Sequence, residues 1–205
     1  MAKYSVVFHP SETVIEAVKE LKEQLSAKIG WYPSKNSLAH VTICEFEYEL
    51  ATYENIKSRI TTFCSYQNPF DVTFNAFENF TNGAFFIAPD TESKNKMAEI
   101  MKETPKQIQF PVSHKSSEPH ISIGRQLSKE QLKEAYNLFQ KIHLNFTCEG
   151  ITIRVFNPER KQYDVLETIP FLSEMEPEKE QLTLFQTTLL YSFLSANDSV
   201  TLDIY

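Results

Sequence analysis

Segments with the hydrophobic pattern of helices and segments with the composition of strands alternate along the first third of the chain. From Ser11 to Gly30 the apolar residues recur at helical spacing, with Ser11 as a candidate cap and Gly30 as the stop. Tyr4–Phe8 before this segment and LAHVTICEF after it are rich in β-branched and aromatic residues, which is typical of strands. With a further helix expected over about 53–66, the pattern predicts the order strand, helix, strand, helix.

The middle of the chain repeats this alternation. Asn82 and Gly83 mark a turn between two predicted strands, and Ser128 with Gln131 three residues later marks the start of a helix. In order, the predicted elements are the strands FDVTFNAFENF and GAFFIAP, the helix TESKNKMAEIMKE, the strand PHISIGR, the helix SKEQLKEAYNLFQKIH, and the strands FTCEGITIRVF and YDVLETIPF. The sequence therefore predicts an α+β fold with two similar halves side by side.

The chain from about Leu172 onward has a different composition. The acidic segment SEMEPEKEQ leads into LTLFQTTLLYSFL, which is too short and too rich in threonine for a membrane span. Added strands or a packing arm are expected there. We therefore divide the chain into a domain of residues 1–171 and a C-terminal extension of residues 172–205.

Composition and charge limit the kind of partner. The chain has 205 residues, 41% of them hydrophobic, with sixteen Phe and nine Tyr, so it can bury a substantial core. A formal net charge of -7 argues against binding of bulk duplex nucleic acid, because that binding depends on neutralising many phosphates. A small phosphate-bearing substrate in a local pocket remains compatible with this charge.

The cysteines and the N-terminus indicate a cytoplasmic protein. Cys44, Cys64 and Cys148 are odd in number, widely spaced and outside any CxxC pattern, so we expect reduced thiols. The N-terminal residues lack the basic and apolar regions of an export signal, and no segment has the length of a membrane span. We therefore expect neither export nor membrane association.

Two histidine-hydroxyl pairs carry the candidate chemistry. Side chains alternate faces along a strand, so His40 and Thr42 share one face, as do His120 and Ser122. A single pair of this kind arises often by chance, but two copies with apolar residues at the second and fourth positions arise in only roughly a few per thousand sequences. Strict alternation also places Cys44 on the His40 face, where we expect a structural thiol.

These motifs resemble those of the 2H phosphoesterase superfamily, which includes RNA 2',3'-cyclic phosphodiesterases, also called 2'-5' RNA ligase-like proteins. HVTI begins at His40 and HISI begins at His120, about eighty residues later, and the flanking Pro119, Arg125 and Phe46 also match. CEF is a less common continuation of the first motif. Over residues 1–171 the resemblance implies a bilobal fold, with an antiparallel sheet and helices in each lobe and an active-site groove between the lobes.

The resemblance also implies a metal-independent mechanism based on the two histidines. Opening a cyclic phosphate requires a base to activate water, an acid to protonate the leaving oxygen, and donors for the nonbridging oxygens. By resemblance to the family, His40 is expected to be the general acid and His120 the general base. Thr42 and Ser122 are expected to donate hydrogen bonds to the phosphate.

Several residues are candidates for substrate binding around this groove. Strict alternation places Arg125 on the face opposite His120, so it reaches the groove only if the strand ends or twists there. Phe46 is a candidate stacking surface, although aromatic residues after strands are usually core residues. Other candidates are Lys115 with the neighbouring His114, and Tyr163 with Arg160 and Lys161 in the loop ERKQY.

No cofactor is expected. The chain lacks the short ligand spacings of zinc sites and the glycine loop of ATP-binding proteins, and it has only four glycines. His9 and His143 lack a hydroxyl residue two positions later, so we treat them as structural or exposed.

Three functions remain open at this point. The leading hypothesis is a phosphodiesterase that hydrolyses 2',3'-cyclic phosphate ends of RNA or nucleotides to 2'-phosphates. The same four residues would serve cleavage of 2'-5' linked or cyclic oligonucleotides, because the walls of the pocket set that choice. A noncatalytic nucleotide-binding or scaffold protein that uses the C-terminal extension is the alternative of another class. The physiological substrate, the occurrence of ligation and the oligomeric state are left open by the sequence.

Overall fold

The computed structural model describes residues 1–176. The chain divides into a compact unit, Met1–Glu174, and a second unit, Met175–Tyr205, most of which is outside the described residues. Backbone hydrogen bonds from Ser173 to Gln67 and from Glu174 to Ser65, both 2.9 Å, fasten the end of the compact unit. The strands or packing arm expected in the extension lie outside the described residues.

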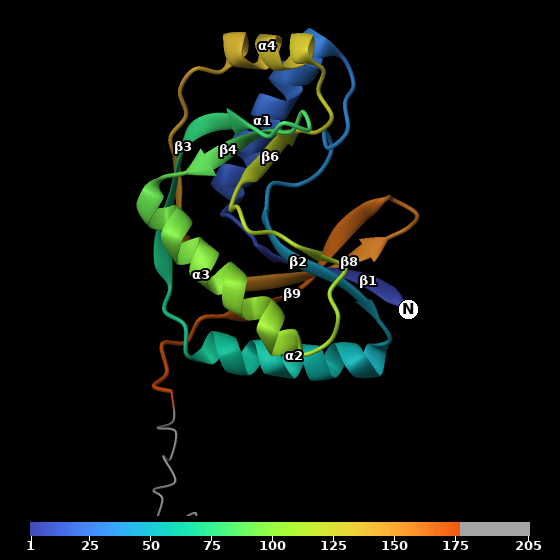
Figure 1. The fold of residues 1–205 in the computed structure, drawn as a ribbon, viewed down its shortest axis with the longest axis vertical. Coiled ribbons are helices and arrows are strands. Elements are labelled where there is room, and N and C mark those ends of the chain that lie inside the picture. Colours follow the sequence, from blue (N-terminus) through green and yellow to red (C-terminus); the bar gives the residue numbers. More distant parts are fainter. Residues whose placement is uncertain (177–205) are drawn as a thin grey trace, which may run out of the picture. The chain divides into compact units, whose positions relative to one another are not determined.

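Nine strands of the compact unit form two antiparallel sheets (Figure 1). The first sheet has five strands in the order β5-β2-β1-β8-β9: β1 (Ala2–Phe8), β2 (Val41–Tyr48), β5 (His114–Lys115), β8 (Gly150–Asn157) and β9 (Gln162–Pro170). The second has four strands in the order β6-β4-β3-β7: β3 (Phe70–Asn79), β4 (Phe85–Pro89), β6 (Ile121–Gly124) and β7 (Leu144–Cys148). The predicted α+β fold with two sheet-bearing lobes is confirmed.

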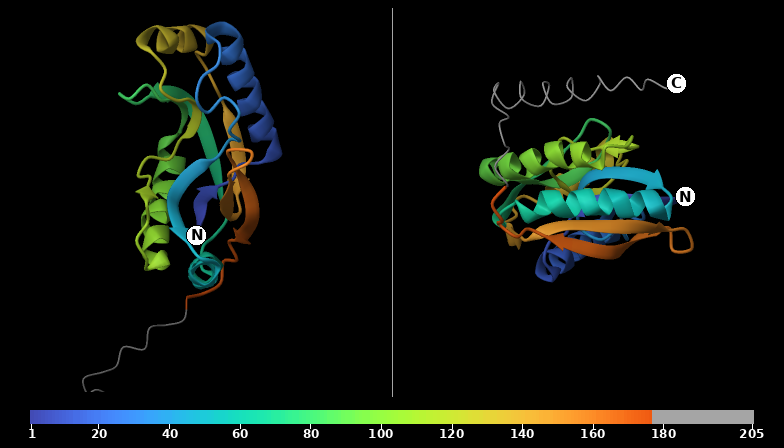
Figure 2. Two further views of the ribbon diagram at one scale, coloured as in Figure 1. Left: turned by 90° about the vertical axis from the view of Figure 1, so that its right-hand side faces the viewer. Right: turned by 90° about the horizontal axis from the view of Figure 1, so that it is seen from below.

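Within residues 1–176, four helices cover these sheets: α1 (Glu12–Ile29), α2 (Leu50–Ser65), α3 (Thr91–Ile108) and α4 (Lys129–Leu138). α1 follows a strand of the five-stranded sheet, yet it packs on α4 and on strands of the four-stranded sheet. α3 contacts strands of both sheets as well as α2. The left view of Figure 2 shows α1 and α3 on opposite sides of the molecule. The helices therefore connect the two lobes.

The lobes do not coincide with the two halves of the sequence, and in this respect the prediction of two halves side by side was wrong. The segment FTCEGITIRVF, predicted as one strand, forms β7 and β8 in different sheets. The chain changes sheets at Glu149 and Gly150. A side chain at Gly150 would place its Cβ 2.3 Å from the Ile169 carbonyl oxygen, so only glycine allows the two backbones to approach this closely.

The helix ends follow local sequence signals. Gly30 ends α1 with a φ of 81°, in the left-handed region that glycine adopts most readily. Ser128 and Gln131 form the predicted capping box of α4. α4 ends earlier than predicted, at Leu138, whereas α3 continues to Ile108 and includes Pro105.

A continuous hydrophobic core joins the sheets and helices. The rings of Phe8, Phe46, Phe74 and Phe85 are fully buried, and each such burial contributes about 1.5–3 kcal/mol to folding. All three cysteines are free and buried. Among residues 1–176, no helix is both long enough and apolar enough to cross a bilayer.

Candidate active site

His40 and His120 are held by the same local interaction. Each stands immediately before a strand, and its Nδ1 lies close to the backbone carbonyl oxygen two residues earlier: 2.6 Å from Leu38 and 2.8 Å from Glu118. A carbonyl oxygen only accepts, so Nδ1 must be the donor and carries the proton in the neutral ring. Both rings therefore keep Nε2 free to accept or to donate a proton to a bound group.

A β-bulge interrupts β2 at the last residue of the first motif. Val6 of β1 pairs with Cys44, whereas the next residue, Val7, pairs with Thr42. Ile43 is thus an extra residue without a partner on β1. A bulge of this kind changes which residues face each side of the strand beyond it.

β6 has a bulge at the equivalent position of the second motif. Phe85 of β4 pairs with Gly124, whereas Phe86 pairs with Ser122, so Ile123 is the extra residue. In both motifs the bulge therefore falls three residues after the histidine.

The two bulges bring Glu45 and Arg125 to the groove. Each stands five residues after its histidine, where strict alternation would place it on the opposite face. Both nevertheless line the cavities of the groove. Arg125 was expected to reach the groove only if its strand ended or twisted there. This is the case, because the bulge at Ile123 and the end of β6 at Gly124 turn Arg125 toward the groove. The sequence did not predict Glu45 as a groove residue, because the bulge that turns it there depends on how β2 pairs with β1.

The same bulge removes Cys44 and Phe46 from the groove face. Phe46 is completely buried, with its ring centroid 5.3 Å from that of Tyr4, so the interpretation of Phe46 as a stacking surface was wrong. Cys44 is also completely buried, as expected of a structural thiol, and burial raises its pKa to about 12.

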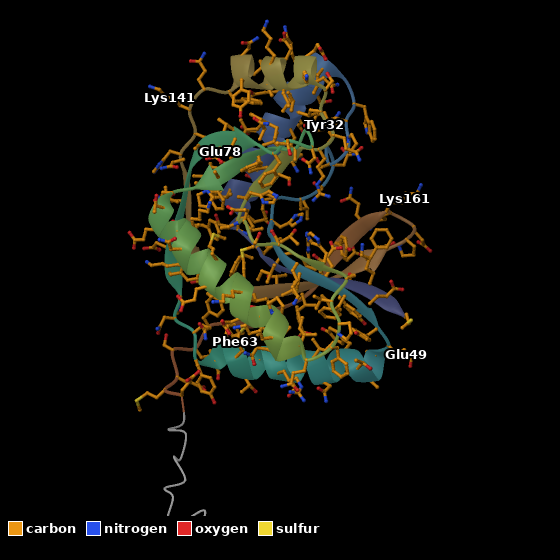
Figure 3. The ribbon with its side chains drawn as sticks, viewed as in Figure 1. Tyr32, Glu49, Phe63, Glu78, Lys141 and Lys161 are labelled. Carbon is orange, nitrogen blue, oxygen red and sulfur yellow. The ribbon has the colours of Figure 1, made fainter. Side chains whose placement is uncertain are left out.

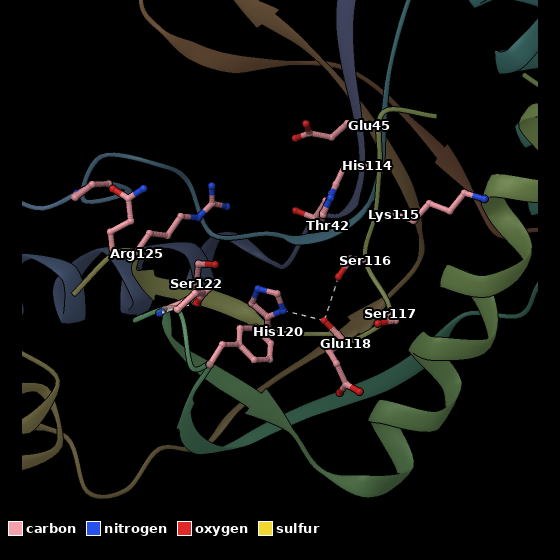
Figure 4. A pocket seen from close by; sticks show the side chains of 15 residues that line it. Thr42, Glu45, His114, Lys115, Ser116, Ser117, Glu118, His120, Ser122 and Arg125 are labelled. Carbon is pink, nitrogen blue, oxygen red and sulfur yellow. Dashed lines mark hydrogen bonds between the residues drawn. The ribbon is translucent and has the colours of Figure 1, made fainter. Parts of the chain in front are cut away.

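The second motif lines a cavity of about 880 Å³. His120, Ser122 and Arg125 lie on one side of it, and Thr42 and Glu45 face them from β2 (Figure 4). The other lining residues are Pro33, Phe80, Asn82, Ala84, His114, Lys115, Ser116, Ser117, Glu118 and Gln126. The structure thus brings Thr42, His120, Ser122, Arg125 and Lys115 to one cavity.

His40 lines an adjoining cavity of about 360 Å³, which we call the second cavity. Tyr163 and Lys161 also line it, from β9 and the turn before β9, whereas their neighbour Arg160 does not. Figure 3 shows Lys161 at the tip of the hairpin that β8 and β9 form. Pro33, Glu45 and Arg125 line both cavities, so the two join along one groove.

The loop before His40 connects the two motifs. Ser34 donates a hydrogen bond of 3.3 Å to the Ile123 carbonyl oxygen, in the bulge of the second motif. On the other side of the loop, the ammonium of the buried Lys22 donates to the carbonyl oxygen of Ser37 at 2.6 Å. Burial lowers the pKa of Lys22 to about 8. Lys22 gave no sequence signal, because it falls among the exposed lysines of a helix pattern.

The comparisons with known proteins agree with this architecture. A family model described as the 2'-5' RNA ligase superfamily matches residues 9–160, which is well over half of the 205 residues. The chain belongs to the 2'-5' RNA ligase superfamily. No curated protein matches the sequence itself.

Solved structures share the fold of this superfamily member at low sequence identity. TT0787 of Thermus thermophilus is 19% identical, with a TM-score of 0.58 over 85% of this chain and 100% of its own. Escherichia coli LigT in its apo form is 13% identical, with a TM-score of 0.59 over 82% of this chain and 95% of its own. LigT complexed with 3'-AMP is 12% identical, with a TM-score of 0.59 over 83% and 98% of the two chains.

The two histidines of this superfamily member differ in the charged groups that act on their pKa values. Burial, followed by the positive charge of Arg154, holds the pKa of His40 well below its usual value of 6.5. Burial also lowers the pKa of His120, but the nearby Glu118 opposes the shift. In the free protein each imidazole is therefore protonated less readily than an unperturbed one, and the charge of Arg154 adds to this effect at His40.

The side chain of His120 is held by two aromatic rings. The ring centroids of Phe80 and Phe86 each lie 5.1 Å from that of His120, and Phe80 meets it edge to face. These contacts, together with the hydrogen bond to Glu118, fix the direction in which Nε2 points.

Within residues 1–176, the side chains that commonly bind metals do not gather into a metal site. No group of three His, Cys, Asp or Glu side chains there is arranged to hold a metal ion. His9 is half-buried and His143 is exposed, whereas His114 lies in the wall of the larger cavity.

Proposed function

We propose that this protein is a metal-independent phosphodiesterase that hydrolyses 2',3'-cyclic phosphate ends of RNA or nucleotides to 2'-phosphates. The proposal assigns the chemistry to His40, Thr42, His120 and Ser122, within residues 1–171. Arg125, Lys115 and Tyr163 are proposed to contact the substrate. A cytoplasmic location is part of the proposal and is supported by the three free, buried cysteines.

The observation that carries this proposal is the repetition of one bulged motif in both lobes. Each copy offers a histidine with a free Nε2 and a half-buried hydroxyl two residues later. Acid-base cleavage of a phosphodiester needs a general acid, a general base and hydrogen-bond donors around the phosphate, and two such imidazoles can fill the first two roles. The membership of the chain in the 2'-5' RNA ligase superfamily adds support.

The proposed reaction breaks the bond between phosphorus and the 3'-oxygen. One imidazole takes a proton from water, whose oxygen attacks the phosphorus. The other imidazolium gives its proton to the departing 3'-oxygen, so the phosphate stays on the 2'-oxygen. Thr42, Ser122 and Arg125 donate to the nonbridging oxygens, where negative charge increases in the transition state.

The assignment of His40 as the acid depends on the bound anion. In the free protein the positive charge of Arg154 opposes protonation of His40, as do Lys22 and Arg125. A phosphate in the groove offsets part of this positive charge and thereby raises the pKa of His40. We therefore propose that the substrate binds before His40 gains the proton that it donates.

Solved relatives support a nucleotide as the substrate. The fold is shared with LigT structures solved with 3'-AMP and with phosphate, at 12% identity and TM-scores of 0.59 and 0.57.

The first experiment measures hydrolysis of the four 2',3'-cyclic nucleotides, and of a short RNA ending in a cyclic phosphate, in EDTA. Phosphorus NMR assigns the products, and the His120→Ala variant is measured beside the wild type. We expect conversion to the 2'-phosphate in the wild type and a loss of about 10²–10⁴-fold in the variant. Thermal melting and nucleotide binding of the variant establish that it is folded.

The other results of this experiment separate the alternatives. Formation of a 3'-phosphate would refute the proposed bond cleavage. No turnover of any cyclic phosphate, with hydrolysis of 2'-5' linked or cyclic oligonucleotides, would favour the second substrate class. No turnover of either, with nucleotide binding retained in a double variant His40→Ala with His120→Ala, would favour a binding or scaffold protein.

A further inference from the structure

Arg154 is a buried cation of β8 that the proposed reaction does not use. Only 4% of its surface is exposed, and it lines the second cavity. Its Nη2 donates to the Ser5 hydroxyl at 3.1 Å, and its guanidinium carbon lies 5.2 Å from the ring centroid of Tyr163. Its Nε has no hydrogen-bond partner.

Within residues 1–176, no carboxylate forms an ion pair with Arg154. The carboxylate of Glu45 lines the same cavity, but it binds Lys3 at 3.1 Å. A buried arginine without a counterion loses hydration that its neutral neighbours only partly replace. An anion that enters the second cavity would supply the missing partner.

The second cavity is cationic although the chain is acidic. Lys35, Arg125, Arg154 and Lys161 line it together with a single carboxylate, that of Glu45, whereas the chain has a net charge of -7. The larger cavity has equal numbers of both charges, since Lys115 and Arg125 there face Glu45 and Glu118. The excess of positive charge is therefore local to the His40 side of the groove.

We propose that the second cavity is a subsite for a second phosphate of the substrate, next to the phosphate that reacts. The substrate class is then a nucleotide end that carries an additional phosphate, either a 5'-phosphate or an internucleotide phosphate. The identity of the reacting group rests on the proposed function. The anion subsite itself rests on Arg154 and the charge of the cavity.

Trp31 offers a surface for a base beside this phosphate and a direct signal of binding. It lines the second cavity, 73% of its surface is exposed, and it is the only tryptophan of the chain. An exposed indole stacks on nucleobases without strong preference for their identity. Its fluorescence therefore reports occupation of the second cavity without any need for turnover.

The binding experiment follows Trp31 fluorescence of the full chain during titration with inorganic phosphate at constant ionic strength. We expect a saturable change whose Kd rises about ten-fold in Arg154→Met, because a charged hydrogen-bonding group is lost. Lys161→Gln is expected to raise the Kd by a smaller factor. Arg160→Gln is the matched control, since Arg160 precedes Lys161 in the same turn, pairs with Asp164 and does not line the cavity.

The kinetic experiment compares adenosine 2',3'-cyclic phosphate with its 5'-phosphorylated form and with a dinucleotide that ends in the same cyclic phosphate. We expect the wild type to have a higher kcat/KM for a substrate with the second phosphate. In Arg154→Met and Lys161→Gln this preference ratio falls toward one. Comparison of the 5'-phosphorylated and dinucleotide substrates shows which phosphate occupies the subsite.

A fluorescence response that is absent, or unchanged in Arg154→Met and Lys161→Gln, would overturn the subsite. If Arg154→Met does not fold, the binding titration is repeated with Lys161→Gln and Lys35→Gln, and an unchanged Kd in both would overturn the subsite. These two variants are expected to fold, because neither lysine is buried. A response that requires these residues, combined with no turnover of any cyclic phosphate, would refute the proposed function and keep the anion subsite. The two proposals can thus fail separately.

Discussion

His40 precedes β2, an inner strand of the five-stranded sheet, whereas His120 precedes β6, an edge strand of the four-stranded sheet. Both are held through Nδ1 by a backbone carbonyl, and a bulge follows both at the same distance. Their surroundings differ, since Arg154 lies on the His40 side and two phenylalanine rings contact His120.

This difference shows that a short motif fixes where the histidine and hydroxyl point, while distant residues set the charge around them. Arg154 is more than a hundred residues away from His40 in the sequence, yet its charge lowers the pKa of His40. Two copies of one motif can therefore serve different roles in a single reaction.

Removal of one hydroxyl donor from each copy tests whether the two copies contribute equally to phosphate binding. Thr42→Val and Ser122→Ala each remove a donor without a large change in shape. We expect kcat/KM on a 2',3'-cyclic nucleotide to fall about 10- to 100-fold in each, because each loses one hydrogen bond to a charged group. Thermal melting serves as the control for folding. A loss in only one variant would show that the phosphate is bound by one motif alone.

A smaller effect is expected in the pH dependence of stability. The folded-state pKa of each histidine lies below 6.5, so the unfolded chain binds protons first as the pH falls. The contribution of each histidine to stability is therefore complete above pH 6.5 and is lost as the pH drops toward its folded pKa. In urea unfolding between pH 5 and 8, His40→Asn and His120→Asn should each weaken this dependence, because each removes a histidine whose folded-state pKa is lowered. Arg154→Met should weaken it in the protein with His40 but not in the His40→Asn variant, because the charge of Arg154 acts on His40. An equal effect of Arg154→Met in both backgrounds would show that Arg154 does not act through His40.

The smallest expected effect concerns Phe46, which the bulge at Ile43 directs into the core. Phe46→Leu should lower the free energy of unfolding by about 1 kcal/mol, as expected for a modest loss of core packing. Its KM should stay at the wild-type value, because the ring does not line the groove. An increase in KM, with stability unchanged, would restore Phe46 as a contact of the substrate.

Local patterns predicted the elements around the site. The helix from Ser11 to Gly30 and the capping box at Ser128 depend on residues within a few positions of one another, and the structure contains both. The fold of two sheet-bearing lobes came from the resemblance of the two motifs to a known superfamily. The exchange of strands between lobes at Gly150 was missed, because an apolar run gives no indication of which sheet each part joins.

The sequence by itself determined the two motifs, since the spacing of a histidine and a hydroxyl along a strand fixes their common face. Only the tertiary structure decided what surrounds them. Strand pairing places the bulges that turn Glu45 and Arg125 into the groove and Phe46 out of it. Folding also buries Arg154 beside the second cavity, because strands far apart in sequence must meet before a buried charge has a defined environment.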